Sequence, residues 1–452
     1  MAGRLGSGIN GCGFGYSAPA LTPMAAPAPL PASGGVLFTA AQLAKWKTRV
    51  GESPIKPGAP NDWQRIGENA ARFLAGEDPV QIPGDPSQQS AWNHGALMRD
   101  AAFVYLLTGD TKYLQPVRQH LLAIVANNDL TKLCIQRANG EWKDGYAESF
   151  MLIRSMAAYD FVRKDLSSAD RITIESWFKR QGMFFAVLGD NNNTRLFPNR
   201  LKGDYSARGR SAADGTMLGR LTYQTGTGAK GPQLSELSQW FNNRTSSSAV
   251  AAGMAGLMTG DVELQNHAKR YFMEWLTYAV YPDGSEGEYA RNGDYGIPRQ
   301  GTIYGQDNIQ AALLFASSLA RQGDRSLYDF RTSDGLFGTQ GGPKSIEMMA
   351  ATHIDLLRKK RDWYSNENGA PQPETHMGRQ RVQYEGGTQD TYNELGMLMA
   401  APDLPNLPIA GVVLRDPAFT SEPFPTQGVS TALASQWTDA YGAYPAVLLL
   451  RP

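Results

Sequence analysis

The sequence has little cysteine and little histidine, and these shortages exclude several kinds of site. Cys12 and Cys134 are the only cysteines among 452 residues, so a disulfide-stabilised scaffold is excluded. The five histidines show no His-x-x-x-His spacing, and neither a Gly-x-Ser-x-Gly motif nor a Cys/His pairing occurs. Metal-dependent and triad hydrolase mechanisms therefore have no support, and we expect no metal and no cofactor.

The sequence also lacks an excess of charge and a long apolar run. Lys plus Arg and Asp plus Glu both number 43, so no overall field attracts nucleic acid or an anionic membrane surface. No apolar run reaches about 18 residues, the length that a membrane span needs. An acidic polymer would have to be held by a local cluster of arginines. The oligomeric state and the redox compartment stay open.

Composition divides the chain into three expected parts. Residues 1–35 are rich in Gly, Ala and Pro, which predicts a flexible tail or anchoring segment. Arg4 is present there, but the apolar stretch that would complete a signal peptide is not, so we expect no clear signal peptide. Residues 36–400 form the expected main domain. Residues 401–452 are Pro-rich and predict a tail that packs on that domain.

Between the two tails the pattern is helical, with a repeated signal for paired helices. Residues 106–110 (LLTGD) and 257–261 (LMTGD) each close one apolar helix and open another, and residues 322–324 (QGD) are a weaker copy. Gly suits the left-handed position just past a helix end, and Asp caps the next helix. The pattern predicts an all-α fold of antiparallel helical hairpins, with helices at roughly 63–75, 90–107, 147–164, 168–187, 244–259, 305–321 and 344–360.

Two long irregular stretches, 189–235 and 281–303, interrupt this pattern. Loops of such length in a compact helical domain are more often functional than idle. In the second stretch and just beyond it, arginines alternate with tyrosines, a mixture that suits carboxylate recognition and sugar stacking. The alternative is a polar surface loop with salt bridges. The residues of interest there are Glu288, Arg291, Tyr295, Arg299 and Tyr304.

Asn242-Asn243-Arg244 precede an apolar helix. An amide near a helix N-terminus, where backbone N–H groups also point outward, is well placed to bind a carboxylate. The alternative is that Asn242 simply caps the helix.

Two further helix starts carry candidate residues. His94 begins a helix beside Trp92 and is a candidate for lining the site. Trp142 and Tyr146 are candidates for a sugar platform. Glu148, close behind them, is explained equally well as a first-turn charge that the helix dipole favours.

Taken together, these motifs resemble the alginate-lyase family of polysaccharide lyases over roughly residues 90–360. The resemblance is carried by Trp92 with the helix that follows it, by Asn242-Asn243, by the turn at 259–261, and above all by 282–291 (PDGSEGEYAR) with Tyr304. It implies an incomplete (α/α) toroid of antiparallel helical hairpins with long active-site loops. Family members have a histidine after the paired asparagines, and this chain has Arg244 there.

The resemblance also implies roles. Asn243 would help to neutralise a uronate carboxylate, Arg291 would bind near it, and Tyr304 would be the catalytic phenol, with Arg244 beside them. The spacing from Arg291 to Tyr304 is longer than usual in the family, so Tyr295 is a competing candidate. The residues expected to bind substrate are Asn242, His94, Trp92, Tyr146, Tyr295, Arg299 and Glu288.

The missing histidine bears on the mechanism. In β-elimination a base removes the C5 proton and an acid protonates the departing O4. One tyrosine can do both when these groups lie on the same ring face, as in mannuronate or glucuronate. Loss of the histidine favours this route, with Arg244 lowering the phenol pKa. His94 is an alternative source of a base from another helix.

The expected protein is thus a lyase acting on an anionic polysaccharide, without nucleic-acid or membrane partners, in an extracellular or periplasmic setting. One alternative is a helical-toroid glycoside hydrolase that uses two carboxylates from Asp283, Glu286, Glu288 and Glu148. Another is a non-catalytic saccharide-binding protein displayed on a virion.

Overall fold

The structure is a computed structural model that describes residues 24–50, 62–77, 94–127, 145–196, 241–280, 284, 286, 300–335, 338–357, 363–365, 379–382, 404 and 443–444. Over these ranges the fold is all-α, with two small antiparallel strand pairs added near its C-terminal side. The helices are α1 (Ala40–Arg49), α2 (Asp62–Leu74), α4 (Ala96–Thr108), α5 (Leu114–Asn127), α6 (Tyr146–Val162), η4 (Arg163–Asp165), α7 (Ser168–Leu196), α10 (Asn243–Thr259), α11 (Val262–Glu274), the π-helical η7 (Trp275–Ala279), α12 (Gln300–Arg321), α13 (Ser326–Asp329) and α14 (Ile346–Leu357). The strands are β1 (Thr332–Gly335) paired with β2 (Gly338–Lys344), and β3 (Trp363–Ser365) paired with β4 (Arg379–Val382).

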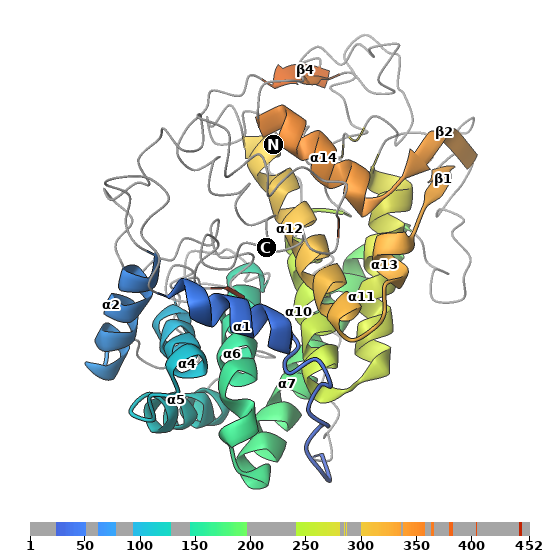
Figure 1. Cartoon of the computed structure of the whole chain (residues 1–452). Helices are drawn as coiled ribbons and strands as arrows, with labels where there is room; N and C mark the ends of the chain where they lie inside the picture. The colour runs from blue at the N-terminus through green and yellow to red at the C-terminus, as the bar shows by residue number, and fades with distance from the viewer. Residues whose placement is uncertain are drawn as a thin grey trace, which may run out of the picture.

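The helices follow one another in an arc, from α2 at the left of Figure 1 to α11 and α13 at its right. Successive members of an inner row, α4, α6, α10 and α12, contact one another, and α5, α7 and α11 form an outer row. Every residue of α6 is buried, and α10 is buried throughout except at Arg244. Helices buried on all sides form the middle of a large helical protein. This arrangement confirms the all-α toroid of helical hairpins that the sequence predicts.

The repeated Gly-Asp signal marks hairpin turns, as expected. Gly109, Gly260 and Gly323 follow helix ends with φ of 72°, 71° and 90°, a region that residues with a Cβ rarely adopt. The Asp261 carboxylate then accepts hydrogen bonds from the N–H groups of Glu263 and Leu264, both at 3.1 Å, and so caps α11.

Two expected loop boundaries were wrong. Helix α7 continues to Leu196 and takes in the first part of the stretch 189–235, and α12 begins at Gln300, inside the stretch 281–303. Asn-rich sequence predicts a helix end, but helix propensity is a weak determinant that the surrounding fold can override. Most of the remainder of both stretches lies outside the described residues.

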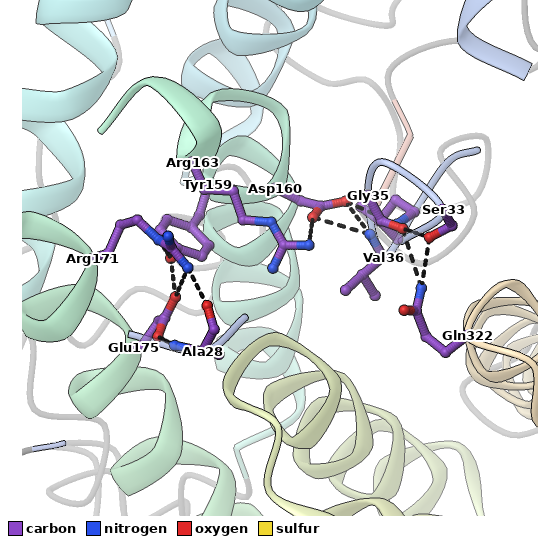
Figure 2. A network of polar contacts seen from close by, with 11 residues as sticks. Ala28, Ser33, Gly35, Val36, Tyr159, Asp160, Arg163, Arg171, Glu175 and Gln322 are labelled. Atoms are coloured by element: carbon purple, nitrogen blue, oxygen red, sulfur yellow. Dashed lines mark hydrogen bonds and ion pairs between the residues drawn. The ribbon is translucent and has the colours of Figure 1, made fainter. Parts of the chain in front are cut away.

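Residues 24–38, which we call the strap, cross the bundle and are anchored by two buried carboxylates (Figure 2). The N–H groups of Val36 and Leu37 donate to the carboxylate of Asp160 in α6, with a shortest distance of 2.9 Å for each. The N–H of Ala28 donates to Glu175 in α7. These two carboxylates satisfy the backbone donors of Ala28, Val36 and Leu37, as an anchoring segment would require.

The strap also reaches the far end of α12 and the C-terminal part of the chain. Gln322 Nε2 lies 3.1 Å from Ser33 Oγ and 3.2 Å from the carbonyl oxygen of Gly35. The Tyr444 hydroxyl donates to the Leu37 carbonyl at 2.7 Å. Residues 1–23 and most of 401–452 lie outside the described residues, so the expected division into three parts stays a prediction.

None of the helices in the described ranges combines the length and the hydropathy that crossing a lipid bilayer requires.

Candidate active site

A buried polar cluster joins the beginnings of two inner helices, α6 and α10, to a third inner helix, α12, about two turns after its start. The Tyr146 hydroxyl, at the start of α6, donates to Asp307 Oδ2 in α12 at 2.6 Å. Asn243, the first residue of α10, donates from Nδ2 to the same Asp307 oxygen at 3.1 Å. Tyr146 is 5% exposed and Asn243 and Asp307 are each 2% exposed. Side chains far apart in the sequence thus meet where α6 and α10 begin.

This location favours anions. The first N–H groups of a helix have no partner within the helix, and its aligned peptide dipoles place positive charge at that end. Helices α6 and α10 both begin at this cluster, and Asp307 lies in the early part of α12. The Asp307 carboxyl lies at the ends of α6 and α10 through its contacts with Tyr146 and Asn243. A substrate carboxylate bound beside Asn243 would experience the same positive field.

Asn242 is the N-cap of α10. Its Oδ1 accepts hydrogen bonds from the N–H groups of Arg244 at 3.0 Å and Thr245 at 2.9 Å, and the Thr245 hydroxyl lies 3.0 Å from the Asn242 N–H in return. The capping role that the sequence left as an alternative is thus present, and it fixes where Asn243 begins the helix. Substrate binding by Asn242 stays a prediction.

Arg244 is the exposed residue of an otherwise buried helix. Its carbonyl oxygen accepts hydrogen bonds from Ser247 at 2.7 Å and Ser248 at 3.2 Å, which reinforce the first turn of α10. The guanidinium belongs to the same helix end as Asn243. A cation is thus provided one residue from the buried amide.

Tyr146 does not present a stacking surface. Its ring packs edge-on against Phe150, with centroids 5.4 Å apart, and its hydroxyl is committed to Asp307. A ring with so little exposure cannot serve as an open sugar platform, so the expected stacking role does not fit. The geometry instead gives Tyr146 a part in holding Asp307.

His94 is buried beside α6. Its ring stacks on that of His120, with centroids 5.7 Å apart, and its Nε2 has no hydrogen-bond partner in the described part of the chain. Burial, with a smaller contribution from the nearby charge of Arg154, lowers the pKa of His94 from 6.5 to about 4. The imidazole is therefore neutral at neutral pH, and at that pH it is a weak base.

We expect acid to destabilise the protein through His94. Between its folded-state pKa of about 4 and the ordinary 6.5, the unfolded chain binds a proton that the folded chain does not. The stability from a neutral His94 is therefore complete above the ordinary pKa and is lost as the pH falls toward the folded-state pKa. Urea unfolding across this window should show a smaller acid loss for His94→Gln than for the wild type; parallel losses would contradict this expectation.

The remaining expected site residues fall mainly outside the described residues. Tyr304 lies in α12, three residues before Asp307, so the two positions share one side of that helix; the Tyr304 side chain itself is not described. The predictions for Trp92, Glu288, Arg291, Tyr295 and Arg299 all concern residues outside the described part.

Glu286 is buried and engaged in structural hydrogen bonds, so it is not placed to be a catalytic carboxylate. Its Oε2 accepts hydrogen bonds from Trp275 Nε1 at 2.9 Å and from Asn308 Nδ2 at 3.0 Å, and its exposure is 0%. Nearby, Gly284 has φ of 81° and packs so closely on Thr352 that a Cβ there would collide with it. Glu286 and Gly284 are thus held against α12 and α14, respectively.

Glu148, a second carboxylate considered for hydrolysis, is 2% exposed in the first turn of α6. Hydrogen bonds from Trp275 and Asn308 hold Glu286 in a structural role, whereas Glu148 is as buried as Asn243, so burial alone does not separate Glu148 from the hydrolase alternative. Asp283 and Glu288 lie outside the described residues.

Asp307 is the site residue that sequence reasoning missed. A signal was present, since Asp307 and Asn308 interrupt a helix in which Ile309 and residues 311–316 are apolar and buried. A charged residue in a helix that is buried all round requires a partner. Its partners come from α6 and α10, and the sequence does not show which helices meet there.

Comparisons with known proteins support the fold. No protein-family model matches the chain, and no match was found among curated proteins. Among solved structures, that of an alginate lyase from Bacteroides ovatus is similar, with a TM-score of 0.50 at 15% sequence identity, over 87% of this chain and 97% of that chain. At this level of identity the likeness concerns the fold alone, and the chain therefore shares the all-α fold of that alginate lyase.

Proposed function

We propose that this protein is a polysaccharide lyase that cleaves a uronate-containing polysaccharide, of the mannuronate or glucuronate type, by β-elimination. The observation that carries the proposal is the meeting of Asn243, Tyr146 and Asp307 where inner helices begin, one helical turn from Tyr304. The fold shared with an alginate lyase supports the same reaction class.

The proposed site holds the substrate by its carboxylate. Asn243 donates a hydrogen bond to the carboxylate, and the positive end of α10 and the guanidinium of Arg291 balance its charge. Their contribution grows during the reaction, because removal of the C5 proton creates enolate-like charge on the carboxylate. Groups that are already in place when this charge develops lower the barrier most.

Tyr304 carries out both proton transfers. Its phenolate takes the proton from C5, the electrons of the C5–H bond form a C4–C5 double bond, and the C4–O4 bond breaks. The phenol then gives its proton to the departing O4, so the enzyme ends in its starting state. This sequence requires the C5 proton and O4 on one face of the ring, as in mannuronate and glucuronate.

Arg244 supplies the positive charge that a phenolate base requires. A cation near a phenol favours the ionised form and lowers its pKa. Arg244 is exposed at the same helix end as Asn243, and the described interactions of its backbone hold that end in place.

The test is a screen of uronate polymers for unsaturated product. Polymannuronate, polyguluronate, glucuronan and glucuronate-containing capsules would be incubated with the full chain, and near-ultraviolet absorbance of the new C4–C5 double bond recorded. Elimination produces this absorbance and hydrolysis does not. New reducing ends without the absorbance would indicate a hydrolase, and binding without either product would indicate a saccharide-binding protein; each result would overturn the proposal.

A further inference from the structure

We infer that Asp307 is a positioning residue of this site, which holds the amide of Asn243 in the orientation that carboxylate binding needs. The inference rests on the proposed function, since it assigns a role within that reaction. Asp307 does not itself contact the substrate in this account. It acts through Asn243, and the Tyr146 hydroxyl holds it in place.

The hydrogen bonds of Asp307 select one orientation of the amide. The Asp307 oxygen that accepts the Tyr146 hydroxyl also faces Nδ2 of Asn243 at 3.1 Å, and a carboxylate oxygen accepts a hydrogen bond from an amide N–H but not from an amide oxygen. A flipped amide would turn its oxygen toward the carboxylate and be repelled.

The position of the carboxylate is itself fixed from a second helix. Tyr146 donates to the same oxygen of Asp307 at 2.6 Å, and both side chains are buried. One oxygen therefore receives hydrogen bonds from α6 and from α10, while its backbone belongs to α12, the helix that contains Tyr304. Asp307 thus sets the distance between the carboxylate-binding amide and the helix of the catalytic phenol.

Such a residue affects the chemical step more than substrate binding. The hydrogen bond from Asn243 strengthens as charge develops on the carboxylate, so a misplaced amide lowers kcat with little change in KM. For Asp307→Ala we expect kcat to fall about 100-fold, the effect of losing one donor to developing charge. Asp307→Asn retains an oxygen that can accept both hydrogen bonds, so we expect it to stay within about 10-fold of the wild type.

A double-mutant cycle tests whether Asp307 acts through Asn243. Kinetic constants would be measured for the wild type, Asp307→Ala, Asn243→Ala and the double variant on the polymer found by the screen, with melting temperatures beside them. If the inference is right, Asp307→Ala costs less than about 3-fold in kcat once Asn243 is alanine, since residues that act as one unit are not additive. Ser317→Ala is the matched control: it breaks another buried pair from α12, with Tyr328 at 2.6 Å, and should leave kcat unchanged.

Three outcomes overturn the inference, and they differ from failure of the proposed function. Fully additive losses in the cycle would mean that Asp307 acts independently of Asn243. A lower melting temperature with unchanged kcat for Asp307→Ala would make it a purely structural residue. Equal losses in Asp307→Asn and Asp307→Ala would contradict the hydrogen-bond argument. A wild-type protein that forms no unsaturated product would instead refute the lyase assignment, and the inference would fall with it.

Discussion

Tyr304→Phe is expected to abolish formation of unsaturated product while leaving substrate binding almost unchanged. Phenylalanine retains the ring but lacks the hydroxyl that both takes the C5 proton and returns it to O4. One general acid–base group contributes about 10²- to 10⁴-fold to a rate, and both transfers are lost here, so we expect kcat to fall by at least about 1,000-fold. Initial rates at saturating polymer, together with calorimetric titration of the same polymer, would separate catalysis from binding.

The matched controls for Tyr304→Phe are two other tyrosines. Tyr146→Phe removes one of the hydrogen bonds to Asp307 and keeps the proposed phenol, so its loss should be far smaller. Tyr295→Phe removes a hydroxyl expected only to bind substrate, so it should keep a kcat close to that of the wild type. Full activity in Tyr304→Phe, with activity lost in Tyr295→Phe, would transfer the catalytic role to Tyr295.

Arg244→Ala tests a different part of the mechanism, through the dependence of the rate on pH. If the guanidinium lowers the pKa of the phenol, its removal raises that pKa and leaves less phenolate at any given pH. The acid limb of the profile of kcat/KM against pH should then move to higher pH. A profile that keeps its position while its height falls would assign Arg244 to binding alone.

The parts of the fold that sequence predicts are those with a local cause. Gly109 and Gly260 have the left-handed backbone that follows a helix end, and glycine is favoured there because an L side chain would be strained. Asp261 caps the helix that follows. These signals need only a few neighbouring residues, so they locate the hairpins from sequence alone. The start of α10 at Asn242 and Asn243 is predicted in the same way, because residues such as Asn are preferred at helix N-termini.

The parts that sequence did not predict depend on contacts between distant segments. Asp307 meets partners 161 and 64 residues away, and nothing near it in the chain identifies Tyr146 or Asn243. Gly, Ala and Pro dominate residues 1–35, a composition that predicts a flexible tail or an anchoring segment but does not say what the strap contacts. Its order comes from Asp160 and Glu175, 124 and 147 residues away from the groups they bind.

Among the substitutions considered, Asp160→Ala is expected to cause the largest loss in the free energy of unfolding. Asp160 is 3% exposed, accepts the N–H groups of Val36 and Leu37, and pairs with the guanidinium of Arg163 at 2.9 Å (Figure 2). Alanine leaves a buried cation without its carboxylate and two backbone donors without their acceptor. Removing one partner of a buried ion pair costs about 3–5 kcal/mol, so we expect the free energy of unfolding in urea to fall by about that amount.

Proteolysis can test separately whether this loss of stability begins with release of the strap. Without Asp160, residues 24–38 lose their attachment to α6, so a protease should cleave the strap of Asp160→Ala before the rest of the chain is cut. Asp110→Ala is the matched control, because Asp110 pairs with Lys112 at 2.9 Å on an exposed turn and is screened by solvent. Asp110→Ala also removes a side-chain acceptor for the Lys112 N–H, so it should lower stability, but less than Asp160→Ala does, and should leave cleavage of the strap unchanged. If the strap of Asp160→Ala resisted the protease as well as that of Asp110→Ala, the Asp160 carboxylate would not be what holds it. Its contacts with α7 and Gln322 would then be the main attachment.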